Sequence, residues 1–227
     1  MDPDFKYKIK TRSEDFGPRM NNIPVIYEDD WFLIVDKPPG LLSIPAPGKQ
    51  ARTLTGILNE ELVKKGVSYR LHPCHRLDKD TSGLIIYAKG KSSQKKMMNE
   101  FKARKVKKTY LAFVQGIIKE DSGRIERPVD GRPAVTCFRT LGRRGGFTVL
   151  EVTSLSGRKN QLRIHLRGIG HPLVGESKFA FRKDYSLKAK RACLHAGFLE
   201  FTHPVTKKTV RVKSRIPKDM EGFLNRH

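Results

Sequence analysis

The residue types best suited to chemistry lie together in the segment His75–Leu84, which reads His-Arg-Leu-Asp-Lys-Asp-Thr-Ser-Gly-Leu. It places the carboxylate of Asp78 two residues after the guanidinium of Arg76 and just before a turn with hydroxyl groups and glycine. The apolar run Leu84–Ala88 that follows is short, β-branched and bounded by glycines, which predicts a buried strand. A nearby cation lowers the pKa of a carboxyl group and keeps it ionised. Asp78 is therefore a candidate nucleophile rather than a candidate general acid.

A simpler interpretation of the same residues exists. Aspartate, serine and threonine often satisfy backbone groups in turns, so Asp78, Thr81 and Ser82 could form a turn and nothing more. For an isolated aspartate this interpretation would be preferred. The rest of the chain favours the catalytic interpretation.

The complete string resembles the signature of the RluA-type pseudouridine synthases, whose catalytic aspartate lies in the pattern His-Arg-Leu-Asp-x-x-Thr-Ser-Gly. Other segments resemble further motifs of that family, in the same order along the chain: Val35–Gly40, Lys108–Ala112, Gly157–Leu166, Gly170–Gly175 and Leu194–Ala196, with Phe201 and His203-Pro204. The resemblance runs from about residue 24 to about residue 215, so it does not depend on one short motif.

The resemblance implies an enzyme that breaks the bond between ribose and uracil, turns the base and rejoins it through carbon 5. Such a reaction needs no cofactor and no metal. By resemblance, Asp78 is the nucleophile, Arg163 is the arginine that pairs with it, and Tyr110 lies beneath the flipped base. Whether Asp78 attacks the ribose or the uracil ring stays open.

The candidate residues for binding the RNA substrate are Arg76, Lys37, His75, Thr81 and Leu162. Arg76 would help to fill the space that the everted base leaves, because a guanidinium can stack on bases and donate hydrogen bonds in one plane. A simple phosphate contact is the alternative for Arg76. Lys37 would contact the RNA backbone near the site. His75 and Thr81, with Ser82, are also interpreted as scaffold for the Asp78 turn.

Two positions depart from the family pattern. Lys159-Asn160 stands where relatives often have Thr-His, and Glu176 follows Gly175 where Asp is common. Neither position is a proposed catalytic group. We expect these departures to affect the packing around Arg163 or the contacts with RNA.

The charge balance indicates a polyanionic partner. The 227 residues include 46 Lys+Arg against 23 Asp+Glu, which gives a formal net charge of +23 and a pI of about 10.2. This surplus favours nucleic acid over a membrane surface, because no strongly apolar helical face accompanies it. We expect ribosomal RNA, transfer RNA or both as the partner, no membrane or small-molecule cofactor, and a monomeric protein.

The cysteines and the N-terminus bear on the cellular compartment. Cys74, Cys137 and Cys193 are odd in number and far apart, so they form neither a disulfide framework nor a Cys-x-x-Cys motif, which suits a reducing compartment. His72 and His75 flank Cys74 closely, but no second cluster of zinc ligands has the usual spacing. No signal region or segment of transmembrane length is visible. We expect a cytoplasmic protein.

The pattern of elements predicts an α+β fold, with a polar extension over residues 1–22 and one catalytic domain over residues 23–227. Strands are predicted over 31–35, 84–88, 110–114, 147–152, 194–201 and 209–212, the last two forming a hairpin. Helices are predicted over 53–65, from Ser92 or Ser93 to about 105, and over 162–169. Strict β-α-β alternation is missing, which favours a mixed, largely antiparallel sheet flanked by helices. The resemblance implies the same fold, with an RNA-binding cleft.

Other functions fit the residues less well. A non-catalytic RNA-binding module of the same fold would explain the charge, but not the joint presence of Asp78, Arg163 and Tyr110. A kinase catalytic loop needs aspartate directly after arginine and an asparagine downstream. A metal-dependent nuclease or deaminase needs clustered carboxylates or a His/Cys zinc set. The sequence therefore predicts an RNA isomerase, with the non-catalytic module as the alternative.

Overall fold

The computed structural model describes residues 19–20, 22–45, 52–180, 185 and 187–227. By its contacts the chain divides into two compact units. The first, here called the aspartate unit, contains the described residues up to Lys107 and Ala196–Ser214, and therefore Asp78. The second, here called the arginine unit, contains Lys108–His195 and Arg215–His227, and therefore Arg163.

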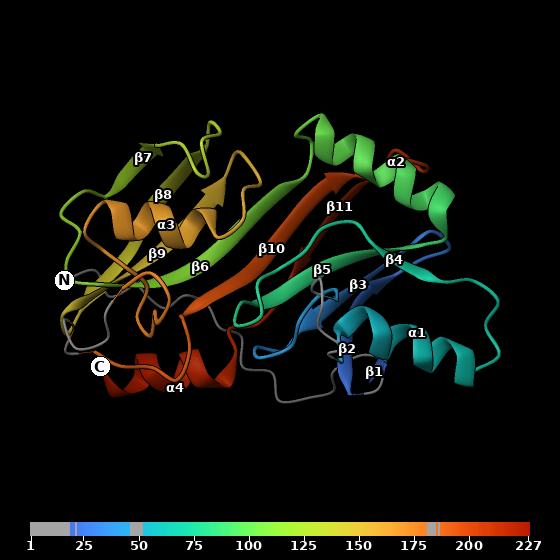
Figure 1. The fold of residues 1–227 in the computed structure, drawn as a ribbon, viewed down its shortest axis with the longest axis horizontal. Helices are drawn as coiled ribbons and strands as arrows, with labels where there is room; N and C mark the ends of the chain where they lie inside the picture. The colour runs from blue at the N-terminus through green and yellow to red at the C-terminus, as the bar shows by residue number, and fades with distance from the viewer. Residues whose placement is uncertain (1–18, 21, 46–51, 181–184, 186) are drawn as a thin grey trace. The chain divides into compact units, whose positions relative to one another are not determined.

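The aspartate unit is built on a sheet whose strands follow one another in space almost as in the sequence (Figure 1). Adjacent strands in order are β1 (Arg19–Met20), β2 (Ile23–Glu28), β3 (Phe32–Lys37), β5 (Ser82–Lys89) and β10 (Leu194–Thr202), which enters this unit at Ala196. Strand β4 (Leu71–Pro73) pairs with β5, and β11 (Thr209–Lys213) forms an antiparallel hairpin with β10. The predicted hairpin is therefore confirmed.

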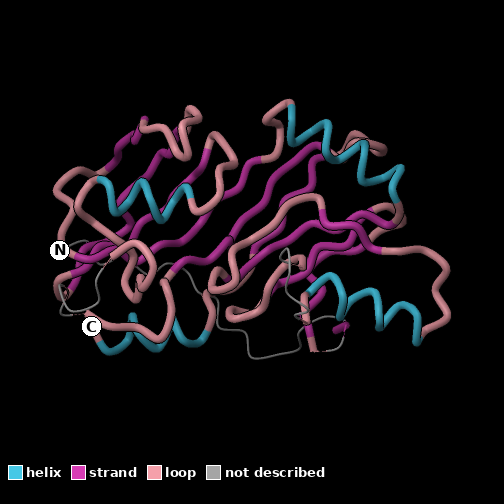
Figure 2. Tube along the Cα trace, in the orientation of Figure 1, coloured by secondary structure: helices cyan, strands magenta, loops and turns pink. Residues whose placement is uncertain are grey.

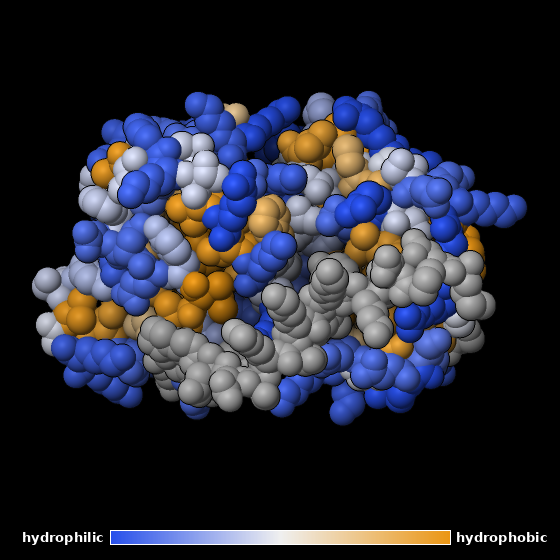
Figure 3. Space-filling view, turned by 180° about the vertical axis from the view of Figure 1, so that it is seen from behind, coloured by the Kyte–Doolittle hydropathy of each residue, from blue (hydrophilic) through white to orange (hydrophobic). Residues whose placement is uncertain are grey.

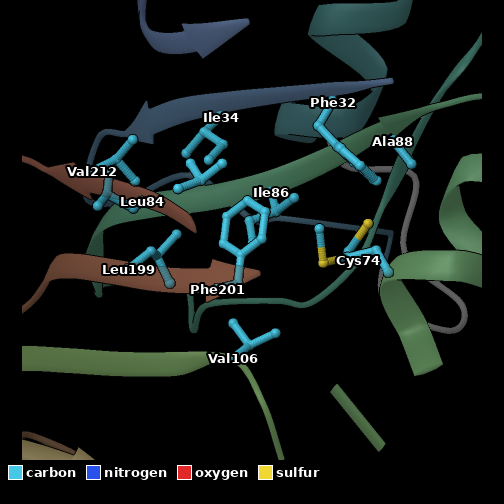
Figure 4. Packing of buried hydrophobic residues seen from close by; sticks show 12 residues of the cluster. Phe32, Ile34, Cys74, Leu84, Ile86, Ala88, Val106, Leu199, Phe201 and Val212 are labelled. Carbon is cyan, nitrogen blue, oxygen red and sulfur yellow. The ribbon is translucent and has the colours of Figure 1, made fainter. Parts of the chain in front are cut away.

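The core of this unit comes from alternate residues of neighbouring strands (Figure 4). Phe32 and Ile34 of β3 meet Leu84 and Ile86 of β5 on one face of the sheet, together with Phe201 of β10. The residues between them in β3, Leu33 and Val35, are buried as well. Both faces of this strand are therefore covered, which explains why its sequence is a continuous apolar run rather than an alternating one.

Helix α1 (Leu54–Lys64) confirms the predicted helix over residues 53–65. The side chain of Thr53 caps it by accepting a hydrogen bond from the Gly56 N–H at 3.2 Å. The predicted apolar stripe is the buried one: Leu54, Ile57, Leu58 and Leu62.

Helix α2 (Lys91–Lys102) begins two or three residues earlier than a serine cap at Ser92 or Ser93 would place it, so that detail of the prediction is wrong. Its N-cap is Gly90, at φ 90°, a left-handed conformation that glycine adopts easily and that turns the chain directly out of β5. Ser93 is a buried residue inside the helix instead. Met97 is fully buried, and Met98 and Phe101 pack against the same core.

The arginine unit contains a second run of antiparallel strands. Their order is β6 (Lys107–Gln115, in this unit from Lys108), β9 (Phe147–Ser154), β8 (Val135–Arg144) and β7 (Ser122–Glu126). Helix α3 (Gln161–Gly168) confirms the predicted helix over 162–169 within one residue, and α4 (Lys218–Arg226) ends the chain. Phe113, Phe147 and Phe223 form the aromatic centre of its core, with ring centroids 5.2–6.0 Å apart.

Both units combine helices and strands without regular β-α-β alternation (Figure 2). The pairs β1–β2, β2–β3, β3–β5, β4–β5, β10–β11, β6–β9, β8–β9 and β7–β8 are antiparallel. The predicted α+β class is therefore confirmed. A single domain over residues 23–227 stays a prediction. In the described part of the chain, helices are too short or too polar to cross a membrane.

Candidate active site

Asp78 lies in the loop between strands β4 and β5, and tertiary hydrogen bonds hold the backbone of this loop on both sides of the aspartate. On the N-terminal side, the Ser43 hydroxyl bonds the backbone of Leu77. On the C-terminal side, the Lys79 carbonyl accepts from the Gly40 N–H at 2.9 Å and from the Lys37 ammonium at 3.0 Å. Residues 37–43 thus form a brace for the loop.

After Asp78 the chain forms a turn, and the Thr-Ser-Gly part of the motif connects this turn to strand β5. The Thr81 N–H donates to the Asp78 carbonyl at 3.1 Å, which is a turn bond. Thr81 and Ser82 are then buried. Gly83 has φ 116°, and a Cβ at this position would lie 2.4 Å from the Ala196 carbonyl oxygen of β10. Only glycine fits there, so this part of the motif is explained by close backbone packing.

His75 connects the loop to strand β5 and to helix α2. Its Nε2 accepts a hydrogen bond from the Ile86 N–H of β5 at 3.1 Å, and its ring packs on Phe101 of α2 with centroids 5.3 Å apart. This geometry fits the interpretation of His75 as scaffold. Arg76 is exposed and Asp78 is half-buried, so both remain within reach of a ligand.

Lys37 occupies a different place from the one expected. Its side chain is fully buried, and its ammonium donates to the carbonyls of Pro38 at 2.9 Å and Leu41 at 2.8 Å as well as to that of Lys79. The expected contact with the RNA backbone does not fit this position, because the charge is enclosed and directed at carbonyl oxygens. Carbonyl dipoles take the place of water around the buried ammonium.

Arg163 lies on helix α3 of the arginine unit, where it forms a side-on ion pair with Glu176. Its Nε donates to Oε2 at 2.8 Å and its Nη2 to Oε1 at 2.7 Å, and both side chains are buried. The guanidinium also lies over the Phe179 ring, 5.1 Å from the centroid. A guanidinium has five N–H donors, so the two bonds to Glu176 do not exhaust its capacity.

The pair has a clear electrostatic consequence for Glu176. Burial would raise the pKa of this carboxyl group, but hydrogen bonds from Arg163 and from the Lys178 N–H, together with the charge of Arg163, hold its pKa below the ordinary value. The Ser177 N–H adds a bond at 3.0 Å. A carboxylate is thus fixed in its ionised state beside Arg163, at the position where the sequence departs from the family pattern.

The other two candidates of this unit are buried on regular elements. Tyr110 lies on β6 opposite Val152 of β9, with 8% of its surface exposed. Leu162 lies on α3 and is also buried, so its side chain belongs to the packing of the helix.

The structure therefore divides the predicted site residues between the two units. The aspartate unit contains Lys37, His75, Arg76, Asp78 and Thr81, and the arginine unit contains Tyr110, Leu162 and Arg163. Pairing of Arg163 with Asp78 stays a prediction. Ser43, which sequence reasoning missed, has one local signal, since it is a polar residue inside the apolar stretch Leu41–Ile44.

Comparison with known proteins gives a consistent result. A family model described as RNA pseudouridylate synthase matches residues 31–167. A Bacillus subtilis protein, the uncharacterized RNA pseudouridine synthase YlyB, is 35% identical over 220 residues, which cover 89% of this chain and 72% of the relative. The dual-specificity RNA pseudouridine synthase RluA of Pasteurella multocida is 34% identical over 200 residues, covering 81% and 89%.

Solved structures agree on the fold. The human RNA pseudouridylate synthase domain containing 4 has a TM-score of 0.75 at 23% identity and covers 89% of this chain and 92% of that one. The human RNA pseudouridylate synthase domain containing 1 has a TM-score of 0.68 at 25% identity, covering 87% and 85%.

The likeness to these two structures shows the fold, an α+β pseudouridine synthase domain. The chain belongs to the RNA pseudouridylate synthase family, and it is an RNA pseudouridine synthase, an isomerase. A non-catalytic RNA-binding module is not favoured.

Proposed function

We propose that this protein isomerises specific uridines in structured ribosomal or transfer RNA, with Asp78 as nucleophile, Arg163 as its counter-ion and Tyr110 beneath the everted base. The observation that carries the proposal is the bracing of the Asp78 loop at Leu77 and at Lys79. The braced backbone limits the positions open to the half-buried Asp78 carboxylate, and a nucleophile that must attack one carbon of the nucleoside requires such a restriction.

The chemistry requires no reagent beyond the RNA. The bond from uracil N1 to the ribose breaks, a bond from carbon 5 to the same ribose carbon forms, a proton leaves carbon 5, and N1 ends protonated. Asp78 would supply the attacking carboxylate, and Arg163 would keep it ionised in a partly dry site. Tyr110 would support the turned base by stacking.

Arg76 would act while the target uracil is everted from the RNA helix. Extruding a base from structured RNA costs a few kcal/mol, and a planar group that occupies the gap lowers that cost. The exposure of Arg76, two residues from Asp78, supports this assignment.

Helix α2 supports the choice of RNA as partner. Four of its residues, Lys91, Lys95, Lys96 and Lys102, are exposed lysines, followed by exposed Arg104 and Lys105. Within the described residues these lysines have no ion pair with a carboxylate. Much of the surface in Figure 3 is likewise hydrophilic. We propose that the lysines of α2 contact RNA phosphates.

The substrate class is supported by the relatives. One is described as dual-specificity, and one from Nitrosomonas europaea, 33% identical over 222 residues, is named a ribosomal large subunit pseudouridine synthase. We further propose a monomer that acts in the cytoplasm. The three free cysteines suit that compartment.

The proposal is tested by incubating the purified protein with ribosomal and transfer RNA transcripts that contain no modification, and mapping pseudouridine in each. Pseudouridine at a few defined positions is the expected result. Transcripts that keep every uridine unchanged would refute the substrate class.

A further inference from the structure

We propose that Ser43 is a positioning residue for the isomerisation, because it fixes the backbone directly before Asp78. The inference rests on the proposed role of Asp78. Ser43 lies outside the aspartate motif, 35 positions before Asp78 in the chain, and acts through Leu77 rather than on the substrate.

One hydroxyl satisfies both backbone groups of Leu77. The Ser43 Oγ donates to the Leu77 carbonyl at 2.7 Å and accepts from the Leu77 N–H at 3.1 Å. A hydroxyl can do both at once, since it has one donor and two acceptor lone pairs. Ser43 is 2% exposed and Leu77 is 5% exposed, so water has little access to replace these bonds.

Ser43 is itself held by regular structure. Its carbonyl accepts from the Thr55 N–H at 3.2 Å and from the Thr55 hydroxyl at 2.8 Å, in the first turn of α1. The Thr55 hydroxyl lies 3.1 Å from the hydroxyl of Tyr87, a fully buried residue of β5. A chain of hydrogen bonds therefore connects Tyr87 of β5, through Thr55 at the start of α1 and Ser43, to Leu77.

The same short segment also fixes the other neighbour of Asp78, through the bonds from Lys37 and Gly40 to the Lys79 carbonyl. With the residues before and after it held, Asp78 can vary mainly through its own side-chain rotamers. A buried N–H and carbonyl left without partners would make the loop shift to find new ones. Loss of the Ser43 hydroxyl should therefore displace the Asp78 carboxylate more than it displaces the RNA.

The test is the split between kcat and KM in Ser43→Ala. We expect kcat to fall by about 10- to 100-fold, the range that a misplacement of about 1 Å can cause. KM and the RNA dissociation constant should change by less than about twofold, because binding does not depend on the position of the reacting atom. Activity is measured well below the melting temperature of the variant, so that folded variant is compared with folded wild type.

Thr148→Val is the matched control. Thr148 is fully buried in the arginine unit, and its hydroxyl likewise donates to a carbonyl, that of Gly116 at 2.9 Å, and accepts from an N–H, that of Ile118 at 2.9 Å. It braces a loop without any proposed site residue. This variant should lower the melting temperature in the same way, while kcat stays within about twofold of the wild type.

Ser43→Cys keeps the inference testable if the alanine variant does not fold. A thiol is a weaker donor and acceptor than a hydroxyl, so kcat should lie between the serine and alanine values. An unchanged kcat in every Ser43 variant that folds would overturn the inference, whether one variant folds or both, as would an equal loss of kcat in Thr148→Val. If Asp78→Asn kept full activity, the proposed nucleophile would fail instead, which separates the two hypotheses.

Discussion

At the scale of single residues, the site contains two kinds of charged group. Some pair with another side chain of the protein, and others are exposed and would pair with RNA. Glu176 binds Arg163 with two short hydrogen bonds in a buried place. Arg76 instead extends from the braced loop as an exposed cation. The first group serves stability and orientation, and the second is available for a ligand.

The Arg163–Glu176 pair makes stability depend on pH in the acid range. The pKa of Glu176 in the folded protein lies below its ordinary value of 4.5. Its stabilising contribution is therefore complete above that value and is lost as the pH falls through the lowered pKa. We expect Glu176→Gln to lower the free energy of unfolding at neutral pH by roughly 3 kcal/mol, because it removes one charge of a buried ion pair.

Urea unfolding followed by circular dichroism between pH 3 and pH 7 checks this prediction, with Glu200→Gln as control. Glu200 pairs with Arg211 on the surface, where both groups are largely hydrated, so its replacement should have little effect. The pair would be shown to be unimportant if the two variants had the same stability and the same acid dependence.

Arg76 gives a prediction about substrate structure. If its guanidinium fills the gap left by an everted base, Arg76→Ala should slow the reaction on a folded stem-loop by about 10-fold or more, because a few kcal/mol of unstacking is no longer offset. A short single strand with the same target uridine should be affected much less. Single-turnover rates on both RNAs decide the matter. Equal losses on the two would indicate a phosphate contact.

The residues also show what a sequence can and cannot disclose. Asp78 could be identified, because its neighbours in the chain form a recognisable string. The burial of Lys37 could not, since its ammonium is enclosed by the carbonyls of Pro38, Leu41 and Lys79, and the last of these is brought near only by folding. Ser43 escaped notice for the same reason, because its partner Leu77 is 34 residues away.

At the scale of elements, apolar periodicity predicted the elements that have a buried apolar face, and it missed elements whose sequence is mostly polar or charged. Helix α1 was predicted within a residue, because four apolar side chains form its buried face. Strand β8 was not predicted, because its basic residues are typical of a solvated, charged surface. In the structure two of them pair with acids across the sheet surface, Arg139 with Glu151 and Arg143 with Asp121.

Helix α4 was missed as well. Its sequence is short and polar, and only Met220 and Phe223 are buried. The periodic signal in two apolar residues is too weak to recognise. The N-terminus of α2 was misplaced because Gly90, and not a serine side chain, turns the chain into the helix.

The exposed row of lysines on α2 gives a prediction at this scale. Replacing Lys91, Lys95 and Lys102 with Gln should weaken RNA binding and reduce the slope of log affinity against log salt by about 2, since each lost phosphate contact removes roughly 0.7 to 0.9. This change in slope is measured by filter binding or fluorescence anisotropy at salt concentrations from about 50 to about 300 mM.

A matched triple variant carries Lys64→Gln, Lys208→Gln and Lys213→Gln, all exposed but spread over α1, the end of the β10–β11 turn and β11. It removes the same charge from other elements and should change the slope much less. Identical slopes for the two triple variants would mean that net charge, and not the α2 face, governs RNA binding.

At the scale of the whole molecule, the proposed catalytic groups come from two compact units. Asp78 and Arg76 belong to the aspartate unit, and Tyr110 and Arg163 belong to the arginine unit. The sequence could list them as one set only through resemblance to a family, because no local pattern connects positions so far apart. The family match and the curated relatives confirm the reaction class, and the solved structures confirm the fold, while the roles of the individual residues stay proposals.

The charge of the whole chain also belongs to this scale. A net charge of +23 attracts any polyanion, so it predicts a class of partner without identifying the RNA or the uridine. Recognition of RNA by its shape leaves little local trace in a sequence. Specificity must therefore be read from the modified RNA itself.

The most direct test of the account compares Asp78→Asn with Asp80→Asn, two substitutions of the same kind in the same loop. Each purified variant is given ribosomal and transfer RNA transcripts, and pseudouridine formation and RNA affinity are measured side by side. Removing the nucleophile should abolish detectable turnover in Asp78→Asn and leave its RNA affinity within about threefold of the wild type, whereas Asp80→Asn should still form pseudouridine. Pseudouridine produced by Asp78→Asn at the wild-type rate would contradict the account.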